Sequence, residues 1–140
     1  MIRAVDGESD EGSVLLLTLG YVLLALVVVL VCACATDLYL AQKRLDALAD
    51  SAAAAGADGF TLALTDGDVR AELTDEGVRT QAEEIVATVD GAAVLVDARA
   101  PDGVSARVTV TAVWHPPVLS PFVPEGVALE ATATSRTALR

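Results

Sequence analysis

One uncharged apolar stretch constrains what this chain can fold into more than any other feature. It runs from Val14 through Leu24 to Ala35, and none of its 22 residues is Asp, Glu, Lys, Arg or His. As a helix it would extend about 33 Å, close to the thickness of the hydrocarbon core of a bilayer. The stretch therefore predicts a transmembrane helix over residues 14–35, preceded by an acidic leader over residues 1–13.

A cleaved secretory signal is the competing interpretation of this stretch. Ala33-Cys34-Ala35 fits the A-x-A pattern that precedes signal-peptidase cleavage. The apolar stretch is longer than a usual signal core, however, and the leader is acidic, with Arg3 as its one basic side chain. We therefore expect an uncleaved anchor, with a secreted protein as the alternative.

Residues 36–57 continue the helical pattern in amphipathic form. Apolar side chains three and four residues apart form one stripe along them. This packing face comprises Leu38, Ala41, Leu45, Leu48, Ala52 and Ala55. With no break after Ala35, we expect one long helix that ends at Gly56 or Gly59. Its small side chains permit close approach, either by the chain's own domain or by another subunit.

The remaining residues, 58–140, predict a small domain of one helix and several strands. The helical pattern covers Asp75–Val89, and strict alternation then predicts strands. The strand segments are Ala92–Ala100, Val104–Trp114 and Val127–Leu139. Pro101-Asp102-Gly103 predicts a turn that joins the first two strands as an antiparallel hairpin. We therefore expect an α+β fold in which a sheet of three or more strands packs against a helix.

Charge excludes some classes of partner. The chain holds 20 acidic and 9 basic residues, and the part after the apolar stretch is itself acidic. Nucleic-acid binding needs clustered Lys and Arg to neutralise phosphates, so we expect no nucleic-acid partner. Anionic lipid headgroups are disfavoured for the same reason.

The residues predict no catalytic, metal or cofactor site. The one histidine, His115, has no cysteine in the distal domain to accompany it, and the acidic residues are scattered. Asp66-Gly67-Asp68 lacks the rest of a calcium-loop pattern and is interpreted as a turn. We expect neither an enzyme nor a small-molecule substrate.

A proline-rich segment, HPPVLSPFVP, lies between the last two strand segments. It is either a peptide-like recognition motif or a connection that its prolines stiffen, and its position between strands favours the connection. Trp114 and Phe122 are candidates to cover the sheet edge there.

The segment around the end of the apolar stretch resembles a known family. Asp37–Leu45 reads DLYLAQKRL, and an alanine-rich run follows from Ala47 to Ala57. This pattern is similar to the N-terminal region of Tad (Flp) pilus-assembly proteins of the TadE/TadG-like group, here in a short form. The resemblance covers about residues 10–57. It implies a pilin-like subunit that acts with other pilus or secretion-apparatus subunits.

The resemblance also implies a topology. The leader would lie inside the cytoplasmic membrane and the distal domain outside it, in a pilus or beside one. Lys43 and Arg44 after the span against Arg3 before it favour the reverse orientation by one residue. Gly12 and Ser13 are the candidate processing site, but no glutamate follows Ser13 as it does in prepilins, so processing stays open. The alternative function is a membrane-tethered binding module outside the cytoplasm.

Overall fold

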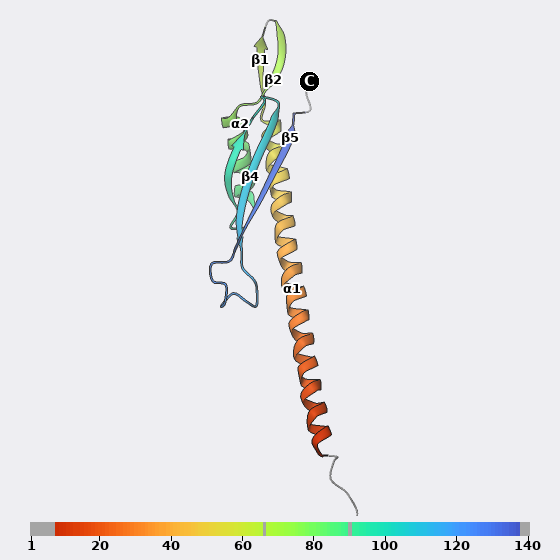
Figure 1. The fold of residues 1–140 in the computed structure, drawn as a ribbon. Coiled ribbons are helices and arrows are strands. Elements are labelled where there is room, and N and C mark those ends of the chain that lie inside the picture. Colours follow the sequence, from red (N-terminus) through yellow and green to blue (C-terminus); the bar gives the residue numbers. More distant parts are fainter. Residues whose placement is uncertain (1–7, 66, 90, 138–140) are drawn as a thin grey trace, which may run out of the picture. The chain divides into compact units, whose positions relative to one another are not determined.

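The computed structural model describes residues 8–65, 67–89 and 91–137, and Figure 1 shows the order of their elements. The chain divides into two compact units, with the boundary between Asp37 and Leu38. A long N-terminal helix is followed by a hairpin, a second helix and a three-stranded antiparallel sheet. The predicted α+β fold is confirmed.

Helix α1 spans Glu8–Asp58 and contributes to both units. It begins at Glu8, six residues before the predicted start at Val14. The helix passes through Gly56, and the Gly59 amide donates a hydrogen bond to the Gly56 carbonyl at 3.3 Å. Of the two predicted ends, Gly59 is therefore the one that the structure bears out.

The first unit exposes the apolar stretch of α1. An 18-residue window there has a mean hydropathy of 3.1 and no buried residue, and among the described residues α1 is the one helix long and apolar enough to cross a membrane. Val14 is 62% exposed and Leu24 57% exposed, and Ala35 is also exposed. Apolar surface of this extent is unfavourable in water, so the segment requires apolar surroundings.

The second unit continues with a hairpin of strands β1 (Thr61–Thr65) and β2 (Asp68–Glu72). Its connection includes Gly67 at a φ of 83°, a left-handed conformation that glycine adopts at little cost. The predicted turn lies here, although its Asp66 is outside the described residues. The hairpin forms a sheet of its own, separate from the larger one.

Helix α2 spans Asp75–Thr88, close to the predicted Asp75–Val89. The Thr74 hydroxyl caps it by accepting a hydrogen bond from the Gly77 amide at 3.1 Å. The Asp75 carboxylate accepts a hydrogen bond from the Ala100 amide at 2.7 Å, which ties the helix start to the end of the following strand.

The three-stranded sheet has the order β3-β4-β5, and all its pairs are antiparallel. Its strands are β3 (Val94–Arg99), β4 (Ser105–Trp114) and β5 (Val127–Arg136). The predicted hairpin of the first two is confirmed, with a register shift between Leu95 and Asp97. The last strand was predicted to reach Leu139, but β5 ends at Arg136, and residues 138–140 lie outside the described part of the chain.

One face of this sheet forms the core of the second unit. The inward side chains of β4 follow the predicted alternation, and Ala106, Val108 and Val110 are each 0% exposed. Val104, the first residue of the predicted strand segment Val104–Trp114, is 45% exposed. It precedes the strand, where Asp102 accepts hydrogen bonds from the amides of Val104 and Ser105 and holds the backbone in the turn.

Candidate functional site: the surfaces of helix α1 and the proline-rich loop

The predicted packing face of α1 is largely buried inside the second unit. Leu45 is 4%, Leu48 7% and Ala52 0% exposed, and all three belong to the core cluster with α2 and the sheet. Leu38 and Ala55 are only half-buried. Of the two kinds of partner left open by the sequence, the chain's own domain is the one that covers this face.

Three alanines on the same face were missed by the sequence analysis. Ala49 is 1%, Ala53 1% and Ala57 2% exposed. The predicted stripe followed a seven-residue repeat, which drifts by about 20° per repeat around a straight helix of 3.6 residues per turn. Over the length of this segment the buried face therefore moves away from Ala55 and onto these alanines. A 3.6-residue period counted from Leu45 would have found Ala49 but not Ala53 or Ala57.

Gly56 marks the closest approach of α1 to its neighbours. A Cβ placed there would lie 2.9 Å from Val78 Cγ1 and 3.3 Å from Ala106 Cβ. These two residues belong to α2 and β4, so the glycine lets both elements approach the helix backbone. The position of this glycine at the end of an alanine run was the signal in the sequence.

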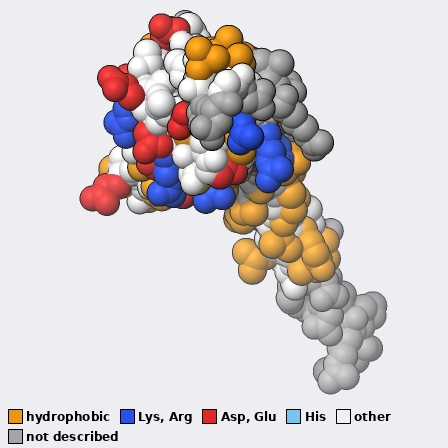
Figure 2. Space-filling view, turned by 90° about the horizontal axis from the view of Figure 1, so that it is seen from above, with side chains coloured by type: hydrophobic (Ala, Val, Ile, Leu, Met, Phe, Trp, Pro, Cys, Tyr) orange, Lys and Arg blue, Asp and Glu red, His pale blue; other side chains and the backbone are white. Residues whose placement is uncertain are grey.

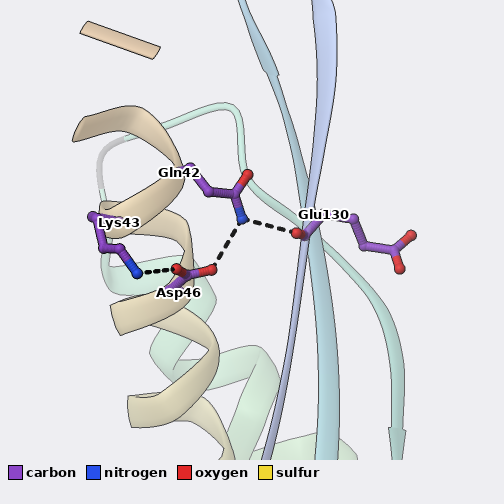
Figure 3. Close-up of polar contacts among 4 residues, drawn as sticks. All are labelled: Gln42, Lys43, Asp46 and Glu130. Carbon is purple, nitrogen blue, oxygen red and sulfur yellow. Dashed lines mark hydrogen bonds and ion pairs between the residues drawn. The ribbon is translucent and has the colours of Figure 1, made fainter. Parts of the chain in front are cut away.

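A small polar network lies on the edge of this interface (Figure 3). The Gln42 side-chain amide donates to the Asp46 carboxylate and to the Glu130 backbone carbonyl of β5, both at 3.0 Å. Lys43 Nζ lies 3.1 Å from the other Asp46 oxygen. Gln42 and Asp46 are both half-buried, since β5 lies against this part of α1.

The network shifts the protonation of its charged members. The hydrogen bond from Gln42, supported by that from Lys43, lowers the pKa of Asp46. The hydrogen bond to Asp46 raises the pKa of Lys43. Each ion thus favours the charged form of the other on the same turn of α1, and the Gln42 hydrogen bond to Glu130 joins this network to β5.

An apolar cavity of about 340 Å³ opens beside this network, within the second unit. Ala41, Arg44 and Leu48 of α1 line one side of it, and Val113 and Trp114 of β4 line another. Val89 to Ala93, on the connection between α2 and β3, contribute further wall residues, with Asp90 outside the described part. The volume lies at the lower end of the range for small-molecule sites.

The proline-rich loop follows β4 and is held in turns by its own backbone. The Ser120 hydroxyl donates to the Pro116 carbonyl at 3.0 Å, and the amides of Phe122 and Val123 donate to the Leu119 carbonyl. Phe122 was a candidate to cover the sheet edge, but it is 82% exposed. Trp114, the other candidate, is half-buried.

The described residues offer no arrangement for metal chemistry. No group of three His, Cys, Asp or Glu side chains within them is placed to hold a metal ion. His115 is exposed at the end of β4, and Cys32 and Cys34 are both free.

Gly12 and Ser13, the candidate processing site, lie within α1, and Ser13 is exposed. Figure 2 shows acidic and basic side chains together on the viewed face of the molecule.

No family model, no curated protein and no solved structure matches this chain.

Proposed function

We propose that this chain is a membrane-anchored structural subunit of a Tad-type pilus or a related secretion apparatus. The first half of α1 crosses the cytoplasmic membrane, with the leader inside and the second unit outside. The subunit works by packing against partner subunits and carries out no catalysis. Its family relationship rests on the resemblance of residues 10–57, above all the segment Asp37–Leu45.

One observation carries this proposal: α1 serves two environments along its length. The apolar window of α1 has no buried residue, whereas Leu45, Leu48 and Ala52 are part of the domain core. A simple tether would not need to supply the core of the domain that it carries. A helix that joins an apolar span to a folded head is the design expected of a subunit that is held in a membrane and assembled through its neighbours.

The orientation is tested with reporter fusions after Arg140 in the host bacterium. A reporter that is active only outside the cytoplasm is expected to be active, and one that is active only inside is expected to be silent. Activity on the cytoplasmic side would overturn both the topology and the pilus assignment.

The assembly role is tested by deleting the gene and restoring it in variant form. Loss of surface pili or of apparatus assembly is expected on deletion, with recovery by the wild-type chain. Leu48→Asp should fail to restore assembly, and Asp50→Asn on the exposed side of α1 should restore it. Normal assembly in the deletion strain would contradict the proposal.

The alternative is a membrane-tethered binding module, and the cavity beside Arg44 is the observation that favours it. Ala93→Trp would fill this cavity. If the Ala93→Trp chain restored assembly of the apparatus in the deletion strain but did not restore the activity of that apparatus, the binding module would replace the structural subunit as the proposed function.

A further inference from the structure

The loop between β4 and β5 carries an apolar surface that the fold leaves open. From His115 to Pro124 it contains no Asp, Glu, Lys or Arg, in a domain that is otherwise acidic. Val118 is 56%, Leu119 37% and Phe122 82% exposed. These three side chains, called here the loop tip, lie on turns that hydrogen bonds and prolines hold in place. The loop tip is therefore ordered without a binding partner.

The loop leaves the sheet at the end of the second unit where α1 enters it (Figure 1). Val113 and Trp114 line the same cavity as Ala41 and Arg44 of α1. Gln42 likewise contacts Glu130 near the start of β5. The opposite end of the unit holds the turn between β3 and β4, where Leu73 of the β1–β2 hairpin segment bonds to Gly103.

This placement brings the loop near the proposed bilayer through the chain itself. Ala35, the last residue of the proposed span, precedes Ala41 and Arg44 by six and nine residues in one helix. Six and nine residues of helix span about 9–14 Å at 1.5 Å per residue, so the chain itself limits how far these positions lie from the end of the proposed span. The polar headgroup layer occupies about 5–8 Å of that distance on each side. The segment from His115 to Gly126 has enough length to cover the remainder.

We propose that the loop tip inserts into the interfacial layer of the bilayer that α1 spans, so that Val118, Leu119 and Phe122 form a second membrane contact. This inference rests on the proposed membrane span. Aromatic and aliphatic side chains are favourable at this depth, and the absence of charge from His115 to Pro124 removes the cost of desolvating ions. The acidic remainder of the domain favours zwitterionic over anionic headgroups. A protein partner for the same surface is an outcome of the test.

The test uses tryptophan as a depth reporter in the full chain, reconstituted in phosphatidylcholine nanodiscs. Trp114 is the only tryptophan, so Trp114→Phe provides a silent background. A reporter is then placed in the loop by Phe122→Trp. The matched control is Leu64→Trp, at a side chain that is 79% exposed on the hairpin at the far end of the unit. A third reporter, Leu24→Trp, lies inside the proposed span.

The Trp in Phe122→Trp is expected to emit at shorter wavelength than that in Leu64→Trp. It should also be quenched by lipids that carry bromine or nitroxide near the headgroup, whereas the hairpin reporter should not. The reporter in Leu24→Trp is read with lipids that carry bromine deep in the acyl chains, because this residue lies at the middle of the proposed span. Quenching of Leu24→Trp by these lipids, together with an unquenched Phe122→Trp, overturns the loop contact and leaves the span intact. If the acyl-chain lipids do not quench Leu24→Trp, the proposed span itself fails. Equal quenching of the loop and hairpin reporters overturns the loop contact as well.

A second measurement keeps Trp114 in place and does not depend on Trp114→Phe. Shallow quenchers should act on Trp114 less in Phe122→Asp than in the wild type, and Leu64→Asp should leave this quenching unchanged. If the loop reporter is shielded in native membranes but not in pure lipid, a protein partner covers the loop and the bilayer contact is wrong.

Discussion

At the scale of single residues, burial decides which positions of α1 matter. Leu48 is 7% exposed in the core, whereas Asp50, two residues further on, is exposed to solvent. A substitution at Leu48 therefore disturbs packed core side chains, whereas one at Asp50 alters a side chain that is in contact with solvent. Gly56 adds a second kind of sensitivity, because its missing side chain is what permits contact with α2 and β4.

Leu48→Asp is expected to destabilise the second unit by more than about 3 kcal/mol, since it loses apolar burial and places a charge in the core. Asp50→Asn should change the free energy of unfolding by less than about 0.5 kcal/mol, as surface substitutions do. Denaturant unfolding of the full chain in detergent, followed by circular dichroism, measures both. Equal stability of the two variants would show that the helix face does not support the domain.

Gly56→Val should also destabilise the unit, by about 1–3 kcal/mol, because the added methyl groups overlap Val78 and Ala106. Gly20→Val is the matched control, since a Cβ at this helical glycine meets nothing within 4 Å. The same unfolding measurement applies. A loss of stability in the control as large as that in Gly56→Val would remove the packing explanation.

At the scale of elements, some stabilising contacts lie within one element or hairpin, and others join distant parts of the chain. Helix α2 has its own cap at Thr74, and the β3–β4 hairpin has its own turn. The contact between Gln42 and Glu130, by contrast, joins positions 88 residues apart.

We expect Gln42→Ala to lower the free energy of unfolding by about 1 kcal/mol, the usual net value of one hydrogen bond, when measured by the same unfolding assay. An unchanged stability would mean that water replaces the amide.

We expect the hydrogen bonds of Asp102 in the β3–β4 turn to make the free energy of unfolding depend on pH. Hydrogen bonds from the Ser105 hydroxyl first, and then from the Val104 and Ser105 amides, lower the pKa of Asp102. The carboxylate therefore stabilises the folded state above the ordinary aspartate pKa of about 4, and this stability is lost as pH falls through the lowered value.

Asp102→Asn should accordingly make the free energy of unfolding less dependent on pH between about pH 5 and pH 2. Ser105→Ala removes the main donor and should move the acid loss of stability to higher pH. Chemical unfolding of the full chain at a series of pH values gives both results. An acid dependence unchanged in Asp102→Asn would mean that the turn carboxylate does not contribute.

At the scale of the whole molecule, α1 ties an exposed apolar segment to a folded unit that uses the same helix for its core. The second unit begins at Leu38, and residues 38–57 supply part of its core. A fragment that starts at Asp58 would lack Leu45, Leu48 and four further core residues of α1. Fragments intended to carry the isolated domain should therefore begin at Leu38.

The intact chain is expected to remain in the membrane with its apolar segment uncleaved. Intact-mass measurement of protein extracted from membranes with detergent checks this, and alkaline washing should not release the protein. A mature chain that starts at Thr36 would refute the anchor. One that starts at Ser13 would show that prepilin-type processing accepts a chain without the usual glutamate.

The sequence by itself determined the features that depend on neighbouring residues. The length of the uncharged stretch, the helix near Asp75–Val89 and the alternation that leads to Trp114 all follow from local periodicity, which needs no knowledge of the rest of the chain. The α+β class followed from the order of these patterns. The polar ends of the elements were predicted less well, because charge and capping extend or shorten them by a few residues.

The tertiary structure alone decided which surfaces are used and which stay open. It placed Ala49, Ala53 and Ala57 in the core and brought Gln42 to the backbone of β5. It also left Phe122 exposed in the loop between β4 and β5. The physical reason is that burial depends on what lies across a helix or strand. That neighbour comes from a distant part of the chain, so no local pattern of residues encodes it.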